Sequence, residues 1–194
     1  MGLISKASKR TLHRRYEAAA AQGDADAMLF LGTVTAQQDP AAAREWFRRA
    51  AEAGNTHAMY ITGLSVEPRD PAAARGWLER AADAGHVDSM VKLGVLDQAQ
   101  APDAARRRYE QAAKRGSPIA MFNLGLLHER TDRDSAIGWY ARAAEEGDAD
   151  AIYNLARLTE DEDPEGAREL IEKAAAAGQS EAQERLRSAS GRGQ

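Results

Sequence analysis

Cysteine is absent from the 194-residue chain, which excludes disulfide bonds and thiolate chemistry. No apolar run approaches the roughly 18 residues that a membrane-spanning helix needs, and the first residues lack the continuous apolar core of a signal peptide. Charge of one sign is not in excess either, because the formal net charge is only -4 and both signs are interspersed. We therefore expect a cytoplasmic protein without a membrane or nucleic-acid partner.

The motifs of common catalytic sites are missing as well. The chain has no Gly-x-Ser-x-Gly elbow, no Gly-rich phosphate loop and no His-Glu-x-x-His sequence. His13 and His128 stand without a sequence partner that would make either one a catalytic base or a zinc ligand. We expect no enzyme activity, no catalytic residues, no cofactor and no metal site.

What the chain does have is a strict internal period. A glycine recurs every 31 residues, at Gly23, Gly54, Gly85, Gly116, Gly147 and Gly178. A period of this length is typical of a solenoid, in which each unit buries its apolar face against its neighbours. The sequence therefore predicts an all-α solenoid of about five 31-residue helix-turn-helix repeats with half-repeat caps.

Helix start and stop signals agree with this period. Each glycine lies where a helix end needs a left-handed residue, and it is followed by a residue that is mostly a good N-cap. The second helix of most repeats is announced by a proline at its first position, as in Asp39-Pro40 and Asp70-Pro71. None of the six prolines interrupts a predicted helix interior.

The period divides residues 1–194 into a single repeat domain. A cap helix at 5–21 is followed by repeats at 23–53, 54–84, 85–115, 116–146 and 147–177, then by a cap helix at 178–189 and a tail at 190–194. Small residues such as Gly125 on the first helix and Ala136 on the second recur where the two helices must approach closely.

Three segments carry a resemblance to a known family: Ala120–Gly125, Ala151–Ala156 and Trp139–Gly147. They resemble Sel-one-like repeats, relatives of tetratricopeptide repeats, and the resemblance covers residues 16–189. It implies a right-handed superhelix whose first helices line a concave surface, and a role as a scaffold that binds peptides or partner proteins. The chain departs from the family in its short loop between helices, such as 35–38.

Equivalent positions on successive first helices are the candidate binding residues. The amides of Asn123 and Asn154 offer both a donor and an acceptor to a peptide backbone, and by similarity they match the asparagines of tetratricopeptide domains that clamp a carboxylate. Basic and aromatic neighbours complete the predicted site: Lys92, Arg157, Tyr153, Phe122 and Tyr60. The alternative is that the asparagines bond to local backbone and the aromatic rings only pack.

Two charged features and the choice of function allow more than one interpretation. A polar row at Asp26, His57, Asp88 and Asp150 falls on first turns of helices, where a negative charge complements the helix dipole, so we prefer that role to a metal site. The acidic turn 160–163 is interpreted as solvated. The leading hypothesis is a non-enzymatic adaptor for a protein or peptide, and the alternatives are a hydrolytic member of the repeat family or a self-assembling repeat protein of undetermined oligomeric state.

Overall fold

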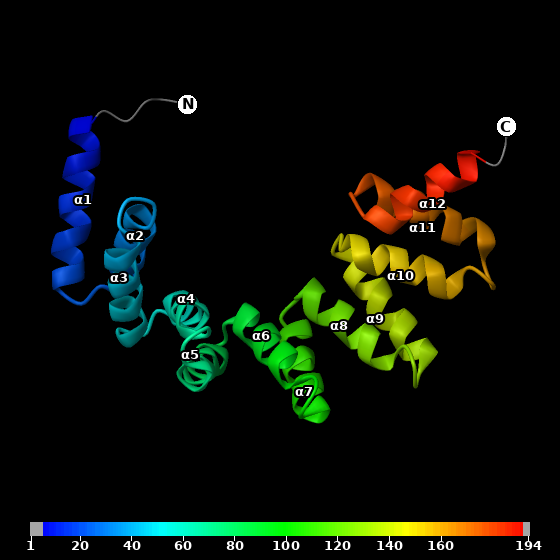
Figure 1. Cartoon of the computed structure of the whole chain (residues 1–194), viewed down its shortest axis with the longest axis horizontal. Helices are drawn as coiled ribbons and strands as arrows, with labels where there is room; N and C mark the ends of the chain where they lie inside the picture. Colours follow the sequence, from blue (N-terminus) through cyan, green and yellow to red (C-terminus); the bar gives the residue numbers. More distant parts are fainter. Residues whose placement is uncertain (1–5, 192–194) are drawn as a thin grey trace. The chain divides into compact units, whose positions relative to one another are not determined.

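The computed structural model describes residues 6–191. Residues 1–5 and 192–194 lie outside the described residues, together with the first residue of the predicted N-terminal cap and the end of the predicted tail. Throughout the described range the secondary structure is helical, without a strand, as Figure 1 shows. The predicted all-α fold is confirmed. The helices are α1 (Lys6–Ala21), α2 (Ala25–Thr35), α3 (Pro40–Glu52), α4 (Thr56–Val66), α5 (Pro71–Asp83), α6 (Val87–Asp97), α7 (Pro102–Ala113), α8 (Pro118–His128), α9 (Arg133–Glu145), α10 (Ala149–Thr159), α11 (Pro164–Ala176) and α12 (Ser180–Gly191).

The chain forms two compact units. Unit 1 is Met1–Leu93 and unit 2 is Gly94–Gln194, with the boundary inside α6. In unit 1 each helix from α1 to α4 packs on the next, and in unit 2 each helix from α7 to α11 does the same. Within both units the helices form the consecutive packed pairs of a helical repeat protein. Each even-numbered helix from α4 to α12 begins 31 residues after the previous one.

The predicted caps are present at both kinds of helix start. The carboxylate of Asp24 accepts a hydrogen bond from the Ala27 amide (2.9 Å), and that of Asp70 accepts one from the Ala73 amide (2.9 Å). These bonds satisfy amides that have no partner inside the helix. All six periodic glycines have φ between 82° and 99°, which is the left-handed region that side chains rarely adopt.

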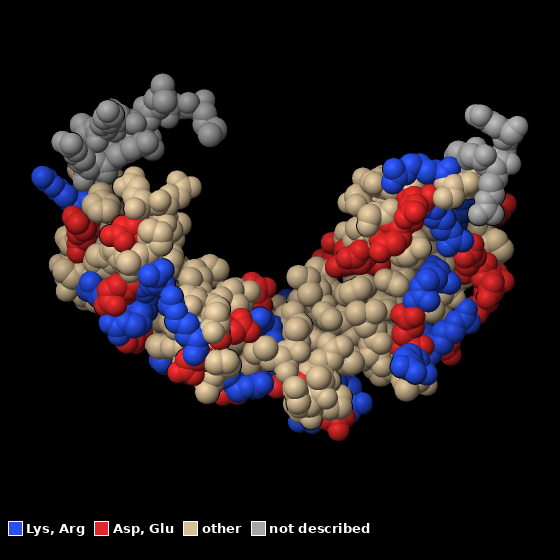
Figure 2. Space-filling model, viewed as in Figure 1, with Lys and Arg blue, Asp and Glu red and all other residues tan. Residues whose placement is uncertain are grey.

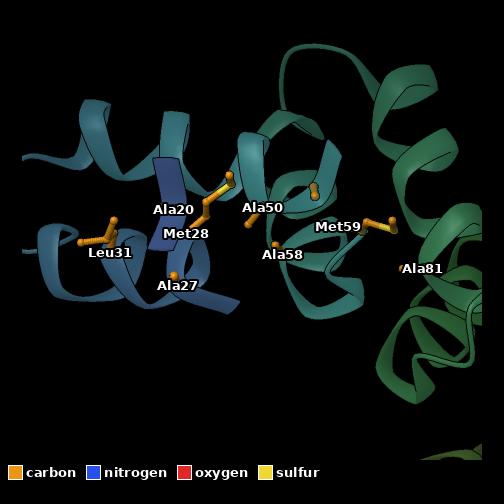
Figure 3. Packing of buried hydrophobic residues seen from close by; sticks show 9 residues of the cluster. Ala20, Ala27, Met28, Leu31, Ala50, Ala58, Met59 and Ala81 are labelled. Carbon is orange, nitrogen blue, oxygen red and sulfur yellow. The ribbon is translucent and has the colours of Figure 1, made fainter. Parts of the chain in front are cut away.

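Alanine and methionine form the core of unit 1. Ala50, Ala51 and Ala58 are completely buried, and Met28 and Met59 are 6% exposed. Figure 3 shows Met28, Ala50, Ala58 and Met59 among the helices that they join. Because the interior is close-packed, this alanine pattern fixes the short distance between neighbouring repeats.

In unit 2 the equivalent alanines, such as Ala112 and Ala120, are also completely buried, and larger side chains lie beside them. Tyr109 and Tyr140 are completely buried, and Leu124 and Ile152 fill the layer beside them. Burying one such aliphatic side chain contributes about 1.5–3 kcal/mol. The equivalent residues Leu78, Tyr109, Tyr140 and Ile171 of the second helices form a buried column, in which Phe47 is only half-buried.

The glycines of the first helices lie against side chains of the second helix of their repeat. A Cβ on Gly125 would lie 2.5 Å from Cε1 of Tyr140, and a Cβ on Gly94 would lie 2.5 Å from Cε1 of Tyr109. The ring of the buried column, more than the alanine on the facing helix, is what requires glycine. At Gly63 both contacts occur, with Leu78 Cγ at 3.1 Å and the Ala74 carbonyl oxygen at 3.3 Å.

Candidate functional site

Helix α8 exposes an apolar stripe. Ile119 is 52% exposed and Leu126 is 41% exposed, and seven residues separate them, so they lie on one face two turns apart. Phe122 and Asn123 lie between them on the same face and are half-buried. In the view of Figure 2 the surface over α8 is largely uncharged. We use the name α8–α10 face for Ile119, Phe122, Asn123 and Leu126 of α8 with Tyr153, Asn154 and Arg157 of α10.

The two predicted asparagines bond to their own helices. Asn123 Nδ2 donates to the carbonyl oxygen of Ile119 (2.7 Å), and Asn154 Nδ2 donates to that of Asp150 (2.9 Å). The local bonds that the alternative reading anticipated are thus present. They occupy the amide nitrogen, and Oδ1 of Asn123 has no hydrogen-bond donor among the described residues.

The amide oxygen of Asn154 is also occupied. It accepts hydrogen bonds from Arg157 at Nε (3.4 Å) and Nη2 (3.2 Å). Arg157 in turn forms an ion pair with Glu129, the C-cap residue of α8. The second oxygen of Glu129 accepts a hydrogen bond from the Tyr140 hydroxyl (2.8 Å). These four side chains connect α8, α9 and α10, so Arg157 is held in place rather than left for a ligand.

The network changes the acidities of its members. Desolvation alone would raise the pKa of Glu129, but the hydrogen bonds from Arg157 and Tyr140 outweigh it and hold the pKa below its ordinary value. Desolvation and the nearby Glu129 carboxylate raise the pKa of Tyr140 far above that of a free tyrosine. Both groups therefore keep one protonation state near neutral pH, which suits a structural network better than proton transfer.

The aromatic rings of the predicted site pack mainly inward. Phe122 lies with its ring centroid 5.7 Å from that of Tyr140. Tyr153 packs against the buried cluster that includes Ile152 and Ile171. Each keeps part of its surface accessible.

Lys92 and Tyr60 belong to unit 1 and have partners of their own. Lys92 Nζ forms an ion pair with Oε1 of Glu67 at 3.0 Å. The ring of Tyr60 lies 5.0 Å from that of His86. Of the seven predicted residues, five are brought together on α8 and α10 of unit 2, while these two lie in the other unit.

Ile119 and Leu126 of this face, and Glu129, which pairs with Arg157, are not among the predicted site residues. Ile119 is the apolar exception in the row that contains Asp26, His57, Asp88 and Asp150. This exception in the sequence could have identified it as a candidate contact residue. Glu129 recurs as Glu67, Gln98 and Glu160 at intervals of 31 residues, a polar row at the ends of first helices. The pairing of Glu160 with Arg185 repeats the pattern at the last repeat.

Neither a metal site nor a membrane span emerges from the described residues. Within residues 6–191 no group of three or more His, Asp or Glu side chains is placed to hold a metal ion. Over the same range no helix combines the length and the apolar character that crossing a bilayer would require.

Comparison with known proteins places this arrangement in a family. The family described as Sel1 repeat matches residues 25–55, 58–86, 118–148 and 149–179. These four segments cover more than half of the chain. The comparison with curated proteins gives no match.

Solved structures show the same fold. A protective antigen from uropathogenic Escherichia coli, described as displaying an SLR fold, is 26% identical with a TM-score of 0.79, over 88% of this chain and 42% of the antigen. This chain therefore spans less than half the length of that relative. A Sel1 repeat protein from Oxalobacter formigenes is 26% identical with a TM-score of 0.72, over 84% of this chain and 75% of that protein.

A third structure extends the fold to a more distant sequence. An immunity protein from Pseudomonas aeruginosa is 17% identical with a TM-score of 0.57, over 86% of this chain and 72% of that protein. The repeat matches, the 31-residue helix spacing and the consecutive helix pairs agree. The chain belongs to the Sel1 repeat family.

Proposed function

We propose that the chain is a non-enzymatic scaffold that binds a partner protein or peptide on the α8–α10 face. The observation that carries the proposal is the exposed stripe of α8, where Ile119 and Leu126 flank the free amide oxygen of Asn123. Single exposed apolar residues are ordinary. Two on one face, beside an acceptor suited to a peptide amide, form a surface that gains free energy when covered.

The network behind the face supports a binding role. Arg157, Glu129 and Tyr140 hold α8, α9 and α10 together. A surface fixed before the partner arrives loses little conformational entropy on binding. The single repeat domain, the right-handed superhelix and the cytoplasmic location predicted from the sequence remain parts of this proposal.

Photo-cross-linking tests the face directly. A photoreactive amino acid at position 126 is compared with the same residue at position 34, because Leu126 and Val34 are 41% and 43% exposed. We expect a discrete adduct from position 126 in an extract of the source cells and none from position 34. Equal labelling at both positions would contradict the proposal. The captured protein is then purified, and Leu126→Glu should weaken its binding by about tenfold or more, since an apolar contact becomes a charge.

Two alternative functions have their own tests. An enzyme needs a nucleophile beside a base, whereas Glu129 and Tyr140, two groups of unit 2 whose pKa values are perturbed, bind each other. Self-assembly would let one copy cover the α8 stripe of another. Sedimentation velocity of the pure chain separates the cases, because self-assembly requires dimers that Leu126→Glu dissociates.

A further inference from the structure

A crevice between α3 and α4 in unit 1 lies apart from the α8–α10 face. Its volume is about 440 Å³. Phe47 of α3 and Ile61 of α4 line it with Pro40 and Pro68, and two arginines, Arg44 and Arg69, complete the lining. The size falls within the range of ligand sites, and the lining combines apolar surface with positive charge.

The charge of Arg44 is not neutralised by any carboxylate within residues 6–191. Of the equivalent positions in the other repeats, 137 is isoleucine and the rest are Arg75, Arg106 and Arg168, each of which has a carboxylate within its own helix. Arg75 pairs with Glu79 (3.7 Å), Arg106 with Asp103 (2.9 Å) and Arg168 with Glu172 (3.2 Å). Arg44 has Ala41 and Arg48 at the corresponding positions. Among the described residues it has no ion-pair partner.

Arg69 adds a second charge that the other repeats lack. The equivalent positions are Gln38, Gln100, Thr131 and Glu162. Within residues 6–191 no carboxylate pairs with Arg69, and the neighbouring acids are engaged elsewhere. Asp39 and Asp70 cap α3 and α5, and Glu67 pairs with Lys92.

Equivalent crevices in unit 2 show what this position accepts. The crevice at Pro102 is smaller, about 150 Å³, and contains the Asp103–Arg106 pair. The crevice at Pro164 is lined by Glu160 and Glu172 beside Arg168 and Arg185. In each the chain supplies a carboxylate to the guanidinium. The α3–α4 crevice has its proline and arginine at the same repeat positions but lacks that carboxylate.

We propose that the α3–α4 crevice binds an acidic segment of a partner protein, with a large apolar side chain against Phe47 and Ile61 and side-chain carboxylates on Arg44 and Arg69. Guanidinium groups bind carboxylates through paired, charge-assisted hydrogen bonds. The apolar lining favours a polypeptide that carries an anchor residue between its acids. This site is in unit 1, so the proposal does not depend on the one made for the α8–α10 face.

The test measures binding of a fluorescein-labelled peptide to the full chain by fluorescence polarisation. The peptide has one tryptophan flanked on both sides by glutamates, and its C-terminus is amidated so that only side chains supply carboxylates. We expect saturable binding that weakens about tenfold or more in the Arg44→Gln/Arg69→Gln variant. Arg106→Gln is the matched control, because Arg106 holds the same repeat position but already has Asp103, and it should leave binding unchanged.

A second variant keeps both arginines. Ala41→Asp places a carboxylate three residues before Arg44, as Asp103 stands before Arg106, and also suits the first turn of α3. It should weaken binding several-fold without lowering the melting temperature. Leu126→Glu should not affect the peptide, which separates this site from the proposed function.

Several outcomes would overturn the proposal. They are no saturable binding, equal loss in Arg106→Gln, or undiminished affinity after the peptide tryptophan is replaced by alanine. Equal competition by a single-stranded oligonucleotide would indicate an unspecific anion site instead. Loss of binding when the peptide glutamates become lysines, together with retained circular dichroism in every variant, supports it.

Discussion

Residue size is matched across the helix pairs α6–α7, α8–α9 and α10–α11. Gly125 accompanies Tyr140 and Gly94 accompanies Tyr109, whereas the last full repeat has Ala156 with the smaller Ile171. A methyl group on the first helix is therefore compatible with an aliphatic partner and not with a ring. The chain therefore fills the same space between two helices either with glycine and tyrosine or with alanine and isoleucine.

Gly125→Ala should destabilise the protein. The new Cβ would lie 2.5 Å from the Tyr140 ring, which is completely buried and bonded to Glu129. Overpacking of this kind costs about 1–3 kcal/mol, partly offset by the better helix propensity of alanine. Urea unfolding followed by circular dichroism measures the change.

Gly138→Ala is the matched control for that variant. Gly138 lies in α9 with nothing within 4 Å of a Cβ, so the substitution should stabilise the protein by about 0.8–1 kcal/mol. Tyr140→Ile should also cost less in the Gly125→Ala background than in the wild type, since the pair then copies Ala156 and Ile171. Additive effects of the two substitutions would show that the ring contact is not the cause.

At the scale of helices, local signals made the fold predictable. A glycine with positive φ and an Asp-Pro start act within a few residues of the chain, and both were visible in the sequence. The binding site was less predictable. Whether Asn123 bonds to its own helix, or Arg157 reaches Glu129, depends on side-chain conformation and on distances between repeats. The buried hydroxyl of Thr62 has no hydrogen-bond partner within the described residues. The sequence could not predict this either, because it depends on the same side-chain conformations.

A ladder of polar contacts joins the starts of successive first helices. Asn55 Nδ2 donates to Asp26 Oδ1 (2.7 Å), and Gln179 Nε2 donates to Asp150 Oδ1 (3.4 Å). At the equivalent place His57 Nδ1 lies 3.3 Å from His86 Nε2. One imidazole must be neutral to accept this hydrogen bond, and the lowered pKa of His86 favours its neutral form.

Stability should therefore fall slightly as the pH drops from 7.5 to 5.5. Desolvation lowers the pKa of His86 and His57 lowers it further, against the opposing effect of Asp88. A lowered folded-state pKa means that the unfolded chain binds the proton first. The contribution is complete above the ordinary histidine value of 6.5 and is lost as the pH falls toward the folded-state pKa.

The urea midpoint at the two pH values measures this effect. His86→Asn is the control, because Asn55 already caps the equivalent helix through the Ala58 amide (2.8 Å) and asparagine does not titrate. The part of the midpoint shift that His86 causes should disappear in this variant. An identical pH dependence in both proteins would assign the shift to other groups.

At the scale of the whole chain, a repeat array transmits stability mainly between neighbours. Helix α12 closes unit 2, where Ala182 is completely buried and Leu186 packs against the cluster that includes Ile152 and Ile171. Removing residues 180–194 would expose that apolar surface. We expect unit 2 to lose about 2 kcal/mol or more, from the burial of Leu186 and its neighbours.

The three tryptophans show which unit loses stability in the truncated protein. Trp46 and Trp77 belong to unit 1 and Trp139 to unit 2. A Trp46→Phe/Trp77→Phe background reports on unit 2 and a Trp139→Phe background on unit 1, each compared with and without residues 180–194. The truncation should lower the urea midpoint reported by Trp139 more than that reported by Trp46 and Trp77, while removal of 192–194 alone should change neither. Equal shifts in both backgrounds would mean that residues 1–194 unfold as one cooperative block, because nearest-neighbour coupling would then extend across the unit boundary undiminished.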